Sequence, residues 1–226
     1  MAKRKLQRFA DVATFDNVAK PTTDQAMNDT FPLKGKWHAD FFKNDHPIVL
    51  ELACGKGEYT VGLAKNYPDK NFIGIDIKGN RLWHGAKYAL ENKMANVGFL
   101  RTRIDFITQL FAAGEVSEIW ITFADPQKER PRKRLTSEMF LNRYRKIMAP
   151  GGKLNLKTDS DLLYEFTREV AAEGKLKVEV DSANIYEELV PSLGGAPLAK
   201  DLLIRTYYET RWLGEGKKIK FISFIP

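Results

Sequence analysis

The sequence has almost no cysteine and very little histidine among its 226 residues. Cys54 is the only cysteine, which excludes an internal disulfide and a cysteine-based zinc site. The three histidines, His38, His46 and His84, show no ligand spacing, so we expect no bound metal. No apolar run approaches the roughly 20 residues of a membrane helix, and residues 1–5 lead into no signal-peptide core. We therefore expect a cytoplasmic protein without a membrane partner.

What the chain has instead is an excess of positive charge. Lysine and arginine number 36 against 29 acidic residues, which gives a formal net charge of +7. This balance predicts an anionic partner without separating nucleic acid from a membrane surface. Hydrophobic residues make up 43% of the chain, enough for a sizeable core. The sequence leaves open whether the protein is a monomer or a homodimer.

The residue pattern changes near residue 47. Residues 1–46 begin with a basic stretch and continue polar, without a sustained period, which predicts a basic N-terminal arm that is partly disordered. In residues 47–226, short apolar runs alternate with stretches of helical period. That alternation predicts a doubly wound α/β domain with a mostly parallel sheet and helices on both faces. The expected strands are 48–52, 72–77, 97–100, 119–123 and 153–156, a run after residue 174, and 218–225.

The first apolar run ends in a loop with two spaced glycines. Gly55 and Gly57 allow a sharp turn and close approach of a ligand to the backbone. Asp76 ends the second strand, where a carboxylate can accept from ribose hydroxyls. Thr60 stands where a dinucleotide fingerprint has its third glycine, which disfavours an NAD-dependent oxidoreductase. Glu51 would repel a pyrophosphate and suits a sulfonium with its amino-acid group. The alternative is that the glycines only form a strand–helix turn.

Further carboxylates follow later strands, and each has two interpretations. Asp105 accepts from an adenine amine or caps a helix at 105–111. For Asp125, before Pro126, and for Asp159 the structural interpretations are a strand-terminal turn and a helix cap, and the functional ones are those that the resemblance described below implies. A basic run follows Asp125, at the strand end where doubly wound folds bind ligands, which favours phosphate contacts over a solvated loop. The run consists of Arg130, Arg132, Lys133 and Arg134.

Taken in order, these segments resemble the bacterial tRNA (guanine-N7)-methyltransferase family. The segments are Glu51–Gly57, Gly74–Asp76, Asp125–Lys128 with the basic run, Lys157–Asp159 and Thr206–Glu209. The resemblance implies a class I, Rossmann-like methyltransferase with a seven-stranded sheet. It also implies transfer of a methyl group from S-adenosylmethionine to N7 of a guanosine in tRNA, in the variable loop. The chain departs from the family at Ala53, where relatives have glycine, and its loop before Leu135 is two residues shorter.

The resemblance also implies residue roles. The implied cofactor contacts are Glu51, Asp76, Asp105 and Asp125, and the loop argument above adds Gly55 and Gly57. Asp125 is also the implied catalytic residue. The implied substrate contacts are Lys128, Asp159, Thr206, Tyr207, Tyr208 and Glu209. Guanine N7 has no proton to remove, so its methylation needs no general base. Carboxylates suit this substrate because they can accept hydrogen bonds from guanine N1–H and the 2-amino group.

Two other functions fit the sequence less well. A methyltransferase acting on a protein or a small molecule needs no basic run beside its active strand. A non-catalytic RNA-binding module with a vestigial nucleotide fold would not bind S-adenosylmethionine, so a titration with that ligand distinguishes it.

Overall fold

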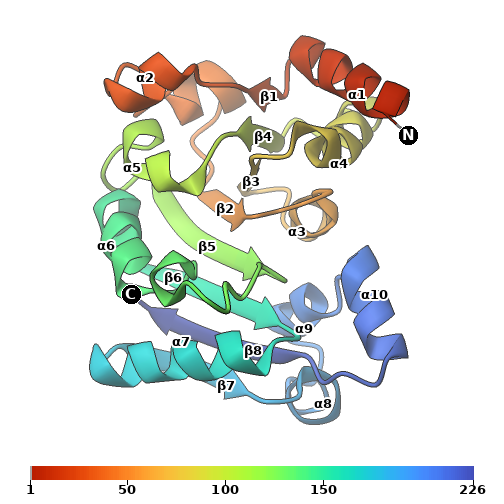
Figure 1. Cartoon of the computed structure of the whole chain (residues 1–226), viewed down its shortest axis with the longest axis vertical. Helices are drawn as coiled ribbons and strands as arrows, with labels where there is room; N and C mark the ends of the chain where they lie inside the picture. The colour runs from red at the N-terminus through yellow and green to blue at the C-terminus, as the bar shows by residue number, and fades with distance from the viewer. Residues whose placement is uncertain (1) are drawn as a thin grey trace.

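The computed structural model describes residues 2–226, with side chains from residue 5 on, so the side chains of Lys3 and Arg4 in the expected basic arm lie outside the described part. The strands form one eight-stranded sheet of order β1-β4-β3-β2-β5-β6-β8-β7 (Figure 1). Neighbours from β1 to β6 are parallel, and β8 runs antiparallel to β6 and β7. The strands are β1 (Val18–Ala19), β2 (Ile48–Leu52), β3 (Asn71–Asp76), β4 (Val97–Arg101), β5 (Val116–Thr122), β6 (Met148–Thr158), β7 (Lys177–Ser182) and β8 (Lys220–Ile225).

The doubly wound α/β class is confirmed, but the sheet has eight strands where the sequence predicted seven. The additional strand is β1, whose two residues pair with Phe99 and Leu100 of β4. Two residues are too few to show the apolar run or the alternation by which a strand is recognised in sequence. Without β1, the strands numbered along the chain lie in the order 3-2-1-4-5-7-6.

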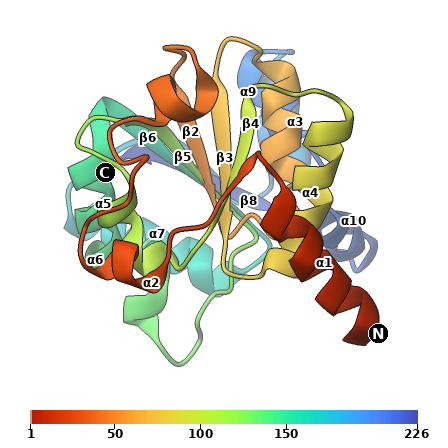
Figure 2. The ribbon, with the colours of Figure 1, turned by 90° about the horizontal axis from the view of Figure 1, so that it is seen from above.

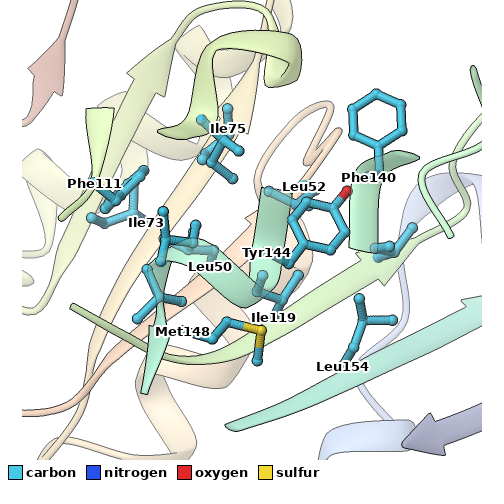
Figure 3. Packing of buried hydrophobic residues seen from close by; sticks show 14 of the residues in the cluster. Leu50, Leu52, Ile73, Ile75, Phe111, Ile119, Phe140, Tyr144, Met148 and Leu154 are labelled. Carbon is cyan, nitrogen blue, oxygen red and sulfur yellow. The ribbon is translucent and has the colours of Figure 1, made fainter. Parts of the chain in front are cut away.

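Helices cover both faces of the sheet (Figure 2). Alternate residues of a strand point to opposite faces, so Leu50 joins the cluster under α5, α6 and α7, while Val49 joins the cluster under α3 and α4. The first cluster contains Ile73 of β3, Ile119 of β5 and Tyr144 of α6 (Figure 3). The helices are α1 (Ala2–Thr14), α2 (Thr23–Met27), α3 (Glu58–Asn66), α4 (Gly79–Glu91), α5 (Ile107–Leu110), α6 (Glu138–Ile147), α7 (Asp161–Glu173), α8 (Val190–Ser192), α9 (Pro197–Leu202) and α10 (Tyr207–Gly214). None of these helices has the length and apolarity to cross a bilayer.

The segment before β2 packs on the sheet domain through Trp37. The indole is fully buried and stacks on Phe111, with ring centroids 5.2 Å apart. Its Nε1 donates to the carbonyl of Leu110 at 2.9 Å. The Glu115 carboxylate accepts from the backbone N–H groups of Gly35 and Trp37 at 3.0 and 3.2 Å. Residues 35–37 are therefore fixed to the loop before β5, and the domain boundary at residue 47 stays a prediction.

We expect Trp37→Ala to lower the free energy of unfolding by about 3–5 kcal/mol, because it empties a buried site that the surrounding backbone cannot fill. Denaturant unfolding should show a lower midpoint with an unchanged slope. Met27→Ala is the control, since that side chain lies in the same segment but is 68% exposed, and it should change stability by less than about 0.5 kcal/mol. Equal midpoints for the two variants would contradict the docking of this segment.

Candidate active site

Two adjacent cavities open at the carboxyl ends of the parallel strands. The first cavity measures about 420 Å³, and the second about 840 Å³. Ala124 and Asp125, which follow β5, line both cavities. The first cavity is also lined by residues that include Ala53, Asp76, Thr102, Asp105, Arg130 and Lys133. The second is also lined by residues that include Lys78, Arg81, Lys128, Asp159, Tyr208 and Trp212.

The loop after β2 turns through left-handed backbone conformations. The φ angles are 58° at Ala53, 57° at Gly55 and 72° at Gly57. A Cβ on Gly57 would lie 2.5 Å from the ring of Phe99, so this position requires glycine both for conformation and for space. Ala53 holds a conformation that only glycine adopts without cost, at the position where the resembled family has glycine. The loop is thus a tight turn, and it also forms part of the wall of the first cavity through Ala53.

Asp76 is held in place by the loop that it faces. One carboxylate oxygen accepts from the N–H of Gly55 at 3.0 Å, and the other from the N–H of Lys78 at 2.8 Å. The side chain is buried but lines the first cavity. Each carboxylate oxygen has a second lone pair, so two hydroxyl groups of a ligand can still donate to Asp76.

Glu51 is enclosed behind the loop and lines neither cavity. It is 3% exposed, and it accepts from the backbone and the hydroxyl of Thr60 on α3 and from the hydroxyl of Thr122 on β5. Burial raises the pKa of the carboxyl to about 7, although these three hydrogen bonds act in the opposite direction. Glu51 therefore joins β2, α3 and β5. In the sequence, Thr60 was interpreted only as the residue that replaces a third glycine, and its hydrogen bonds to Glu51 could not be predicted.

Asp105 forms ion pairs rather than a helix cap. Lys133 Nζ lies 3.0 Å from the carboxylate, with Arg103 at 3.5 Å and Arg143 at 3.8 Å. Burial alone would raise the pKa of Asp105, but these cations outweigh it and lower the pKa. No side chain caps the 3₁₀ turn that contains Asp105 or the short helix α5. The cap interpretation is wrong, and Asp105 faces the first cavity.

The loop after β5 brings Asp125 to the boundary between the cavities. Phe123 and Gln127, on either side of it, have φ angles of 50° and 47°, which are costly for residues other than glycine. The N–H of Gln127 donates to Asp125 Oδ1 at 2.9 Å and orients the carboxylate. Asp125 thus lies in a strained turn and also at the junction of the two cavities. Its interpretation as a turn residue is therefore compatible with the catalytic role that the resemblance implies.

Asp159 lies in the second cavity beside basic side chains. Its carboxylate pairs with Lys217 Nζ at 3.1 Å, and its backbone carbonyl accepts from Lys220 Nζ at 3.1 Å. The cap of α7 is Ser160, whose hydroxyl accepts from the N–H of Leu163, so Asp159 is not the cap. The cations that line this cavity are Lys78, Arg81, Lys128, Lys217, Lys218 and Lys220. Apart from Lys128, their contribution did not follow from the sequence, because they come from elements far apart in the chain.

Within the segment Thr206–Glu209, only Tyr208 lines the second cavity. Thr206 caps α10 through its hydroxyl, which accepts from the N–H of Glu209 at 3.1 Å. Tyr207 is 57% exposed, and Lys56 Nζ lies 4.2 Å from its ring centroid.

Glu209 is fully buried. Lys157 Nζ lies 2.7 Å from its carboxylate, and the hydroxyl of Tyr186 donates to it at 2.8 Å. Burial lowers the pKa of Lys157 to about 8, against the opposing effect of this carboxylate. In this structure Glu209 therefore supports the start of α10 and lines neither cavity.

The basic run does not form one surface. Arg130 and Lys133 line the first cavity, Arg132 is exposed, and Arg134 is buried. The prediction that every residue of this run contacts phosphate is wrong for Arg134, because its side chain is buried. Among the described residues, no group of three or more His, Cys, Asp or Glu side chains is arranged to hold a metal ion.

Comparisons with known proteins agree with this geometry. A family model described as "Putative methyltransferase" matches residues 45–222. The tRNA (guanine-N(7)-)-methyltransferase of Bacteroides thetaiotaomicron is 50% identical to this chain, covering 99% of this chain and 86% of that protein. The protein of the same name from Christiangramia forsetii is 48% identical, covering 99% of this chain and 98% of that protein.

Solved structures support the fold. The crystal structure of the 16S rRNA methyltransferase KamB matches with a TM-score of 0.60 at 14% identity, over 82% of this chain and 90% of that one. The expectation of a class I methyltransferase fold is confirmed. The family model and the similarity to the Bacteroides and Christiangramia proteins, nearly from end to end, show that this chain belongs to the family of bacterial tRNA (guanine-N7)-methyltransferases.

Proposed function

We propose that this chain transfers a methyl group from S-adenosylmethionine to N7 of a guanosine in the variable loop of tRNA. The observation that carries the proposal is the position of Asp125, which lines both cavities at the carboxyl end of β5. A transferase needs such a junction, because donor and acceptor must meet in one place with their reacting atoms in line. The curated relatives from Bacteroides and Christiangramia support the choice of substrate.

The first cavity fits the methyl donor. Its volume of about 420 Å³ lies within the range of small-molecule sites. Asp76 can accept from both ribose hydroxyls, and Asp105 can accept from the adenine amine. Gly55 and Gly57 do not line this cavity, and they would act by giving the turn beside it its left-handed conformation. When bound, S-adenosylmethionine supplies an electrophilic methyl group on a sulfonium. Glu51 would act from behind the cavity by holding the loop in shape.

The second cavity fits a guanosine in RNA. Its cations can neutralise phosphates, and Tyr208 with Trp212 can stack on a base that has left its own stack. Asp159 can accept from the guanine edge, and Lys128, in the loop that carries Asp125, can donate to the RNA. Guanine N7 already has its lone pair, so the contribution of the protein is positioning and stabilisation of developing charge.

Thr206, Tyr207 and Glu209 take a supporting role in this proposal. Thr206 caps the helix that carries Tyr208, and the pair of Glu209 with Lys157 fixes that helix to β6. Glu209 would reach a guanine only if this buried pair opened. With tRNA as its substrate, the enzyme would work in the cytoplasm.

The direct test of the function is incubation of the purified protein with S-adenosylmethionine and unmodified tRNA, followed by mass spectrometry of the nucleosides. We expect 7-methylguanosine, and mapping of the modified nucleotide should place it in the variable loop. Methylation of another nucleoside would refute the proposed substrate atom. A protein that binds tRNA but neither S-adenosylmethionine nor its demethylated product would be an RNA-binding module instead.

We expect Asp76→Asn to weaken S-adenosylmethionine binding by about 1–3 kcal/mol, or roughly 5- to 150-fold, because a charged acceptor is lost. Isothermal titration calorimetry measures this affinity. Asp24→Asn is the matched control, since Asp24 is exposed on α2 and lines neither cavity. Wild-type affinity in a folded Asp76→Asn variant would remove the ribose assignment.

Asp125 and Asp159 should differ in what they affect. Asp125→Asn should lower the single-turnover methylation rate roughly 100-fold and also weaken S-adenosylmethionine binding, because Asp125 lines both cavities. Asp159→Asn should lower methylation while leaving S-adenosylmethionine affinity unchanged, because it lines only the second cavity. Rapid-quench assays and calorimetry test both variants. A near-wild-type rate for Asp125→Asn, or lost cofactor affinity in Asp159→Asn, would contradict this division.

A further inference from the structure

Arg134 is a buried cation without an acidic partner. It is 6% exposed, although it belongs to a run of basic residues that the sequence assigned to phosphate binding. Among the ion pairs of the described residues, none includes Arg134. A guanidinium at such a depth is retained only where hydrogen bonds and packing replace its hydration. The hydrogen bonds and packing of the Arg134 guanidinium therefore indicate what this residue does.

The guanidinium of Arg134 binds the loop that carries Asp125. Its Nε donates to the carbonyl of Pro126 at 3.0 Å, and Nη2 donates to the carbonyl of Lys128 at 3.4 Å. Its other side is covered by Phe166 of α7, with Cζ 4.5 Å from the ring centroid. The planar fork of arginine suits this arrangement, because one rigid group reaches two carbonyls while its face stacks on an aromatic ring.

The residue between the two carbonyls is Gln127, which has a φ of 47°. A non-glycine residue keeps this conformation only when its surroundings enforce it. Arg134 thus holds the peptide bond before Gln127 and the peptide bond after Lys128. The N–H of Gln127 in turn donates to Asp125 Oδ1 at 2.9 Å. A continuous set of contacts thus runs from Arg134 through the strained residue to the carboxylate at the junction of the two cavities.

We propose that Arg134 is a positioning residue for methyl transfer, which holds the left-handed turn at Gln127 and thereby the orientation of Asp125. Its Nε and Nη2 donate to the loop and its side chain is buried, so we expect no phosphate contact from Arg134. This inference rests on the proposed function in that Asp125 is the group being oriented. It separates Arg134 from its exposed neighbour Arg132 in the same run.

The test compares Arg134→Met and Arg134→Lys with the control Arg168→Met. Arg168 also stacks on an aromatic ring, that of Tyr164, but it is exposed on α7 and lines neither cavity. We expect the single-turnover rate at saturating tRNA and S-adenosylmethionine to fall at least tenfold in Arg134→Met and less in Arg134→Lys. Affinity for tRNA and its salt dependence should match the wild type. Arg168→Met should match the wild type in every measurement.

A second change makes the test specific for the turn. Glycine adopts the φ of Gln127 without strain, so Gln127→Gly added to Arg134→Met should recover part of the lost rate. A double variant no faster than Arg134→Met would overturn the proposal. It would also be overturned by an unchanged rate at saturation combined with weaker tRNA binding and a salt slope lower by about 1, the pattern of a lost phosphate contact.

Hydrogen exchange separates a failure of this inference from a failure of the proposed function. The amide of Gln127 should exchange faster in the Arg134 variants than in the wild type, whatever the substrate is. Inactive wild-type protein with this exchange difference would refute the function and leave the role of Arg134 in the loop intact. Unchanged exchange would refute that role. If Arg134→Met does not fold, Arg134→Lys alone decides, through the same rate, affinity and exchange measurements.

Discussion

The parallel alignment of the central strands is the constraint on which the rest of the molecule depends. β2 is hydrogen-bonded to β3 on one side and to β5 on the other, so the order of strands reverses at this point. Connections after β2 and β5 leave the sheet in different directions, and a crevice opens between them. The first cavity occupies this crevice, lined by the segments that follow β2, β3, β4 and β5. The second cavity extends it toward β6 and α10. The two cavities are therefore adjacent because of the strand order, whichever side chains line them.

Two buried carboxylates support the cavities without lining them. Glu51 joins β2 to α3 and β5, and the pair of Glu209 with Lys157 joins α10 to β6. Removing one member of the Glu209–Lys157 pair would leave an uncompensated buried charge, so a substitution there would lower stability as well as activity. Loss of activity alone would not distinguish the supporting residues from those that touch substrate. Measurements of affinity and stability on the same variants are needed for that purpose.

The sequence predicted the fold class, the central strands and the residues Asp76, Asp105, Asp125 and Asp159, which the structure places around the two cavities. Their position at strand ends was sufficient, because parallel strands bring their carboxyl ends to one edge. The sequence did not distinguish Glu51 and Glu209 from them. How deeply these two carboxylates are buried depends on partners distant in the chain. Thr122 is 71 residues from Glu51, and Tyr186 is 23 residues from Glu209. Strand β1 could not be predicted because its two residues are too few to show a pattern, and the contacts of Trp37 could not because they come from residues distant in the chain.

Of the seven non-glycine residues with positive φ among the described residues, three lie where the cavities meet the sheet. Ala53, Phe123 and Gln127 adopt left-handed conformations without being glycine, and all three belong to loops that line a cavity. Such conformations persist only where surrounding contacts outweigh their cost. For Gln127 those contacts are the hydrogen bonds that the Arg134 guanidinium donates to the carbonyls of Pro126 and Lys128. For Ala53 the neighbouring N–H of Cys54 donates to the carbonyl of Ile75, which fixes the turn to β3. A glycine at residue 53 would remove the strain, but it would also remove a methyl group from the wall of the first cavity. The shape of that wall is thus maintained at a cost in backbone energy, which the hydrogen bonds between the loop and the neighbouring strand offset.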